Sequence, residues 1–74
     1  MSQIKRSLSL AGHRTSLALE PEFWAVLDAA CAAQGRSLAS LIGEIDEERV
    51  LKGDDAGLAS ACRVWALRQA QSRA

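Results

Sequence analysis

Apolar and polar residues alternate near the N-terminus of the chain and then recur at helical spacing. From Ser16 to Leu19, leucines alternate with small residues, which is typical of a half-buried β-strand. The inner face of this strand carries Leu17 and Leu19. Its outer face carries Arg14, Ser16 and Ala18. We therefore expect one short strand with an apolar inner face and a more polar outer face.

Helical patterns follow this strand to the end of the chain. Pro21, flanked by glutamates, favours a helix start because proline suits the first turn and acids stabilise the positive end of the dipole. Gly35 is expected to end this helix. Ser37 is placed to cap a second helix, and Asp54 or Asp55 to cap a third. The fold is thus mainly α with one short N-terminal strand. The apolar stripes predict a core of Leu17, Leu19, Phe23, Trp24, Leu27, Leu41, Ile42 and Ile45.

The predicted strand lacks a partner for its backbone N–H and C=O groups. One candidate is the equivalent strand of a second copy, which makes the core residues a dimer core. The other is residues 6–10, where Leu8 and Leu10 also alternate, folding back through residues 11–13 as a hairpin. We favour the dimer because Ala-Gly-His is not a strongly preferred tight turn and because a 74-residue chain is short for a stable core of its own.

The chain is expected to consist of two parts. Residues 1–13 are expected to be a basic arm, and residues 14–74 a single domain that includes a C-terminal helix at about residues 56–70. We recognise no internal repeat in the chain.

Charge is unevenly distributed, although nine basic and nine acidic residues give a net charge of zero. Residues 1–19 contain Lys5, Arg6 and Arg14 and no acid, whereas residues 20–58 contain all nine acids. A basic segment on an acidic body favours local contact with a polyanion. The alternative is that these side chains only keep the protein soluble.

Several classes of function find no support in the sequence. Cys31 and Cys62 lack the spacing of a zinc or redox site and a neighbouring base, so we expect buried thiols in a reducing cytoplasm. His13 is the only histidine, and we expect no metal site, no cofactor and no enzyme activity. No apolar run approaches the ~20 residues of a membrane span, so we expect a cytoplasmic protein without membrane contact.

Residues 15–24, followed by a helix to Gly35 and a second helix opening at residues 36–38, resemble the ribbon-helix-helix DNA-binding domain. The run from residues 6–16 on to Phe23 and Trp24 is similar to a group of small bacterial ribbon-helix-helix proteins. The resemblance covers about residues 6–50, and the last helix looks like an addition shared within that group.

The resemblance implies a homodimer whose intersubunit, antiparallel two-stranded ribbon enters the major groove of double-stranded DNA. It assigns base contacts to Arg14, Ser16 and Ala18, although Ala18 departs from the longer polar side chains that the family usually has on this face. Phosphate contacts then fall to Lys5 and Arg6 on a flexible arm, and to Arg36, Ser37 and Leu38 at the start of the second helix.

We expect a dimeric transcriptional regulator that acts as a repressor by blocking transcription sterically. The alternative is a protein-interaction or oligomerisation module, including an antitoxin-like role, that uses the same fold without specific DNA binding. In that case a protein partner is expected at the acidic surface of residues 44–48 or at the C-terminal helix. In either case, a higher oligomer is the alternative to the homodimer.

Overall fold

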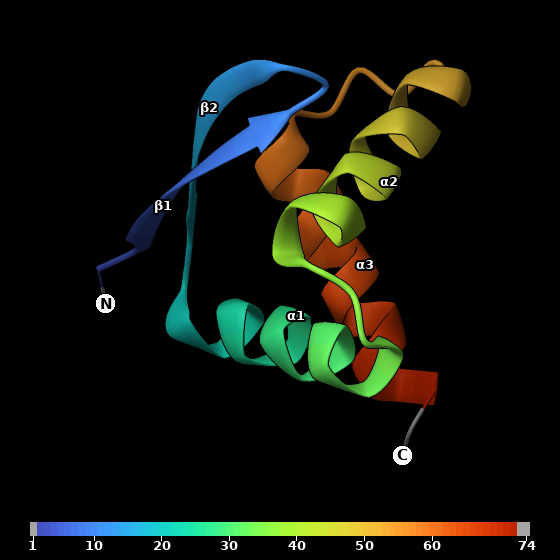
Figure 1. Ribbon diagram of the computed structural model, residues 1–74. Coiled ribbons are helices and arrows are strands. Elements are labelled where there is room, and N and C mark those ends of the chain that lie inside the picture. The colour runs from blue at the N-terminus through green and yellow to red at the C-terminus, as the bar shows by residue number, and fades with distance from the viewer. Residues whose placement is uncertain (1, 73–74) are drawn as a thin grey trace.

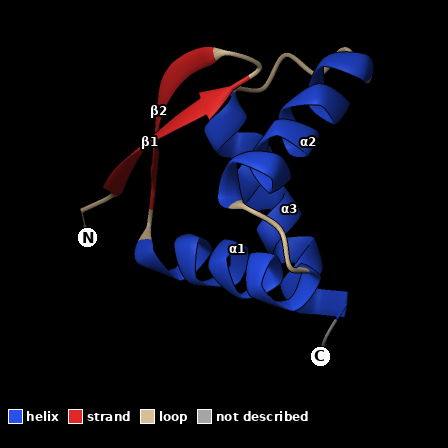
Figure 2. Ribbon diagram, viewed as in Figure 1, coloured by secondary structure: helices blue, strands red, loops and turns tan. Residues whose placement is uncertain are grey.

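The strands and helices lie on opposite sides of the molecule in the computed structural model, which describes residues 2–72 (Figure 1 and Figure 2). Met1, Arg73 and Ala74 lie outside the described residues, so the expected domain limits at 1 and 74 do too. The elements follow in the order β1 (Ile4–Leu10), β2 (His13–Leu19), α1 (Pro21–Gln34), α2 (Leu38–Leu51) and α3 (Leu58–Ser72).

The N-terminal segment contains two strands, not one. Strand β2 pairs antiparallel with β1 of the same chain, from Leu10 opposite His13 at the turn to Ile4 opposite Leu19 at the far end. The prediction that this strand pairs across a two-fold axis is therefore wrong, and the hairpin alternative is confirmed. The predicted arm is also wrong, since Lys5 lies in β1.

A two-residue turn joins the strands and explains why the hairpin forms. Ala11 and Gly12 both have positive φ, 51° and 82°. Positive φ at both central residues is the requirement of the type I′ turn, whose twist matches that of the flanking strands. The predicted turn of residues 11–13 is wrong, because His13 is the first residue of β2 and only two residues form the turn.

The helix ends follow local sequence signals. Pro21 is the first residue of α1, and Gly35 ends it in the left-handed conformation with φ 64°. Ser37 caps α2 and accepts a hydrogen bond from the backbone N–H of Ser40 at 3.1 Å. The predicted aspartate cap of α3 is wrong: the Asp54 carboxylate accepts from the N–H of Ala56 at 2.9 Å, within the loop before the helix.

A single chain encloses the hydrophobic core. The inner face of the hairpin packs on the helices, with α2 against β1 and α3 against β2. Of the predicted core residues, Phe23 is partly buried and the other seven are buried. The remaining buried apolar side chains are Leu8, Ala30, Cys62 and Ala66. The core thus forms without side chains from a second copy.

Candidate nucleic-acid interface

The hairpin has a buried face and an exposed face. Residues directly opposite each other in an antiparallel pair point to the same face, and successive residues point to opposite faces. Leu8, Leu17 and Leu19 are buried, so they mark the face against the helices. The alternation predicted for residues 14–19 is confirmed by this register.

The exposed face is formed by every second residue of both strands. Ser7 lies opposite Ser16 in the middle, and the pairs Lys5 with Ala18 and Ser9 with Arg14 lie on either side. Ala18 is half-buried, and the other five side chains are exposed. We call these six residues the outer ribbon face: Lys5, Ser7, Ser9, Arg14, Ser16 and Ala18.

The outer ribbon face carries two positive charges and no acid. Within residues 2–72, neither Lys5 nor Arg14 takes part in an ion pair. Both cations therefore remain available to an anion outside the chain. Small side chains between them keep the backbone close to any bound surface.

Arg6 lies on the other face and is held by the protein itself. Its guanidinium donates to the two carboxylate oxygens of Asp28 at 2.9 and 3.1 Å. The Arg6 Cζ atom also lies 4.3 Å from the centroid of the Trp24 ring, within the range of a cation–π contact. Trp24 Nε1 donates to the Ile4 carbonyl at 2.8 Å, which fixes the start of β1 on α1.

The residues at the start of α2 also use their polar groups internally. Arg36 donates to Ser40 Oγ at 2.9 Å and forms an ion pair with Glu44 at 3.0 Å. The Ser37 hydroxyl serves as the helix cap. Leu38 packs against the core. The structure does not bring these residues into the outer ribbon face, and their phosphate contacts stay predictions.

A polar network joins the end of the hairpin to two helices. The Glu20 carboxylate accepts from Arg63 Nε of α3 at 2.9 Å and from Gln3 Nε2 at 3.2 Å. The hydrogen bond from Arg63 lowers the pKa of Glu20, and further hydrogen bonds to its carboxylate act in the same direction. This network and the Arg6 contact hold the ribbon in a fixed orientation on the helices.

The ribbon-helix-helix domain family matches residues 3–70, which include both strands and almost all of α3. The chain belongs to the ribbon-helix-helix family. No curated protein and no solved structure matches it. Ribbon-helix-helix domains are commonly DNA-binding regulators, they typically dimerise, and they are typically non-enzymatic. The resemblance drawn from the sequence is confirmed, and the match extends beyond residue 50 to the last helix.

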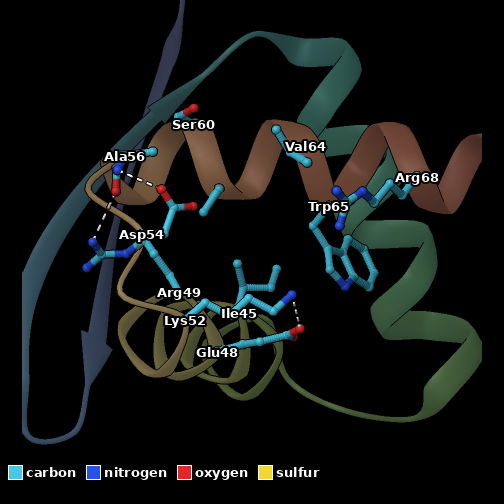
Figure 3. A pocket seen from close by; sticks show the side chains of 11 residues that line it. Ile45, Glu48, Arg49, Lys52, Asp54, Ala56, Ser60, Val64, Trp65 and Arg68 are labelled. Carbon is cyan, nitrogen blue, oxygen red and sulfur yellow. Dashed lines mark hydrogen bonds and ion pairs between the residues drawn. The ribbon is translucent and has the colours of Figure 1, made fainter.

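This ribbon-helix-helix domain also has a groove between the second half of α2 and α3, of about 240 Å³ (Figure 3). Ile45 and Trp65 contribute apolar surface to it. An ion pair between Glu48 and Lys52, 2.8 Å apart, lies at its edge. Arg68 also lines the groove and has no ion pair within the described residues.

The thiols of the domain are poor nucleophiles. Burial raises the pKa of Cys62 to about 11, and burial also raises the pKa of Cys31. Both thiols are therefore protonated at neutral pH. Among residues 2–72, no group of three or more His, Cys, Asp or Glu side chains is arranged to hold a metal ion. No described helix has the length and apolar character needed to cross a membrane.

Ser7 and Ser9 of the outer ribbon face were missed as site residues in the sequence analysis. Their alternation with Leu8 and Leu10 was visible. This alternation predicts an exposed face for Ser7 and Ser9, just as the alternation around Leu17 predicts one for Ser16. The residues were passed over because they had been placed in a flexible arm.

Proposed function

We propose that this ribbon-helix-helix protein binds duplex DNA by inserting the β1–β2 hairpin into the major groove, and that it regulates transcription in this way. The outer ribbon face is the observation that carries the proposal. It combines Lys5 and Arg14 with small side chains and no acid. The major groove is about 12 Å wide and accepts a two-stranded ribbon.

The side chains of this face suit the edges of base pairs. Arg14 can donate two hydrogen bonds to O6 and N7 of guanine, and Ser16 can bond to several bases. Ala18 can contact the methyl group of thymine. Lys5 supplies a second positive charge at the other end of the ribbon, which favours the phosphates or a further guanine.

A regulatory role follows if the protein binds DNA within a promoter. A protein bound in the major groove at a promoter excludes polymerase sterically, so we propose a repressor that acts on the nucleoid in the cytoplasm. The predicted homodimer no longer draws support from an unpaired strand, because β1 and β2 satisfy each other. Formation of a dimer or a higher oligomer stays a prediction. Sedimentation of the full chain measures its oligomeric state and tests this prediction.

Fluorescence anisotropy tests the proposal. It measures the affinity of the full chain for a mixed-sequence duplex and for a selected site over a series of salt concentrations. We expect Arg14→Ala to weaken binding to the selected site by about 1–3 kcal/mol. Arg68→Ala is the matched control, because it removes the same charge from the exposed side of α3. Its affinity is expected to stay within about twofold of wild type.

Two results would contradict DNA binding by the ribbon. One is the absence of duplex binding by the wild-type chain even at about 50 mM salt, where phosphate contacts are strong. The other is an equal loss of affinity in Arg14→Ala and Arg68→Ala. An equal loss would mean that overall charge, and not the ribbon, determines binding.

The second candidate is a protein-interaction module, favoured by exposed apolar side chains on the helices. Leu51 is 79% exposed and Leu67 is 54% exposed, and Val50 and Val64 are also exposed. Exposed apolar side chains are available for contact with another protein, and they mark an interface where they form a contiguous patch. Replacement of Leu51 and Leu67 by glutamate should abolish self-association if the helices mediate it, and unchanged sedimentation would reject that role.

A further inference from the structure

Both strands of the hairpin carry the same short sequence pattern. Residues 5–10 are Lys-Arg-Ser-Leu-Ser-Leu, and residues 14–19 are Arg-Thr-Ser-Leu-Ala-Leu. Each segment has a basic residue at its first position, small residues at the third and fifth, and leucine at the fourth and sixth. The chain therefore contains an internal repeat of strand sequence, and the expectation that it has no repeat is wrong.

The strand register turns this repeat into an approximate two-fold symmetry. Ser7 and Ser16 hold the same place in the two segments, and they lie directly opposite each other. An axis through this pair, perpendicular to the sheet, exchanges Lys5 with Arg14 and Ser9 with Ala18. The outer ribbon face thus has a cation at each end, on opposite strands.

The helical layer follows the same order. Helix α2 packs against β1, and α3 packs against β2. Both helices begin with Leu-Ala-Ser, at residues 38–40 and 58–60. The axes of the two helices cross, and they do not lie parallel (Figure 1 and Figure 3). One chain therefore supplies both strands of the ribbon and the helix that supports each strand.

From this symmetry, and resting on the DNA-binding role proposed above, we infer that a single chain reads a short inverted repeat in DNA. Lys5 reads a guanine in one half of the site and Arg14 reads the equivalent guanine in the other half. Two-fold related side chains meet equivalent base edges on opposite DNA strands, because the duplex backbone has two-fold axes of its own. Lys5 is thereby assigned a base contact beside Arg14, and no second copy is needed to complete the reading surface.

The separation of the two cations sets the size of the site. Arg14 lies opposite Ser9, so it is displaced by four residues along the ribbon from Lys5. At about 3.3 Å per residue this displacement is about 13 Å. With about 3.4 Å between successive base pairs, the two guanines are expected about three to four base pairs apart.

The difference between lysine and arginine makes the two contacts unequal. The planar guanidinium of Arg14 presents a fork of donors to guanine O6 and N7, whereas the ammonium of Lys5 acts as a compact charge. Lys5→Arg should therefore make the ribbon more symmetric and tighten binding to the inverted repeat. The replacement keeps the charge and lies on an exposed position, so the fold is retained.

Two measurements test this inference. The full chain is first used to select bound sequences from random duplexes, and native mass spectrometry then gives the number of chains in the complex. We expect an inverted repeat with one guanine in each half and one chain per duplex. Arg14→Ala should weaken binding to that site by about 5- to 150-fold, which corresponds to the loss of one bidentate contact. Lys5→Ala and Arg14→Ala should each select a single guanine, whereas Arg68→Ala should select the complete repeat. Circular dichroism checks that the variants are folded.

The outcomes separate this inference from the proposed function. A selected site without inverted symmetry, a symmetric site that holds two chains, or an unchanged repeat for Lys5→Ala would overturn the single-chain reading and leave DNA binding intact. Absence of binding to any duplex at about 50 mM salt would overturn both.

Discussion

At the scale of single residues, Ala11 decides how the ribbon is assembled. It is the only residue other than glycine with positive φ among residues 2–72. The two-residue turn that it forms with Gly12 places Leu10 opposite His13, and this pairing fixes the register of the whole hairpin. Because a shift by one residue would exchange the two faces, the turn also determines which side chains reach the outer ribbon face.

Replacement of Ala11 by asparagine should stabilise the domain by about 0.5–1 kcal/mol, because asparagine tolerates the left-handed region and Asn-Gly is a preferred type I′ turn. The urea midpoint of unfolding measures the change. Ala11→Val is the opposing variant, since a β-branched side chain at this φ is strained, and it should lower the midpoint. A lower midpoint for the asparagine variant would contradict the turn geometry.

At the scale of elements, the junction between the hairpin and the helices depends on polar contacts over an apolar core. Arg63 and Glu20 join α3 to the end of β2 with side chains that are 30% and 32% exposed. The Arg6 ion pair with Asp28 joins β1 to α1. Partly exposed ion pairs contribute little stability each. Their main effect is to orient the ribbon relative to the helices.

Acid should weaken this junction. The folded-state pKa of Glu20 is lowered by the hydrogen bond from Arg63, so its carboxylate contributes stability above the unfolded value of about 4.3. That contribution is lost as the pH falls through the folded-state pKa. Glu20→Gln should therefore flatten the fall in thermal stability from about pH 5 downwards.

Glu22→Gln is the control for this experiment. Glu22 lies in the first turn of α1, is exposed, and has no ion pair within the described residues. We expect its acid dependence to stay closer to that of wild type. If both glutamine variants had the same profile, the contact between Glu20 and Arg63 would not be the cause.

At the scale of the whole molecule, one chain buries the apolar face of its own ribbon. Leu19, Leu27 and Ile42 are each 0% exposed without any contribution from a second chain. The two-stranded ribbon alone would be marginally stable. Helices α2 and α3 pack against its two strands. Formation of the outer ribbon face and formation of the core are therefore the same folding event.

Leu17→Lys should abolish folding of the isolated chain, because it places an unpaired charge in the core where Leu17 is 3% exposed. Ala18→Lys is the control on the same strand and should remain folded, because Ala18 belongs to the outer ribbon face. Thermal unfolding followed by circular dichroism compares the two variants. A folded Leu17→Lys variant would contradict the assignment of the inner face.

The sequence by itself determined the features that depend on near neighbours. Alternation around Leu17 assigned the inner and outer faces of β2, Pro21 and Ser37 marked the starts of two helices, and Gly35 marked an end. These signals are readable because the groups that satisfy one another lie within a few residues along the chain. The exposed position of Arg14 was also predicted from its near neighbours in sequence.

Only the tertiary structure decided which strand β2 pairs with and which cations stay available. Two strands with the same alternation can pair within a chain or between chains, and the choice depends on a tight turn and on helices that cover the ribbon. In the same way, Arg6 and Lys5 are adjacent in sequence, but Arg6 alone meets Asp28, 22 residues further along the chain. Contacts between residues far apart in sequence leave no local pattern in the sequence. Only the tertiary structure therefore shows that Arg6 binds the protein itself, whereas Lys5 lies on the outer ribbon face.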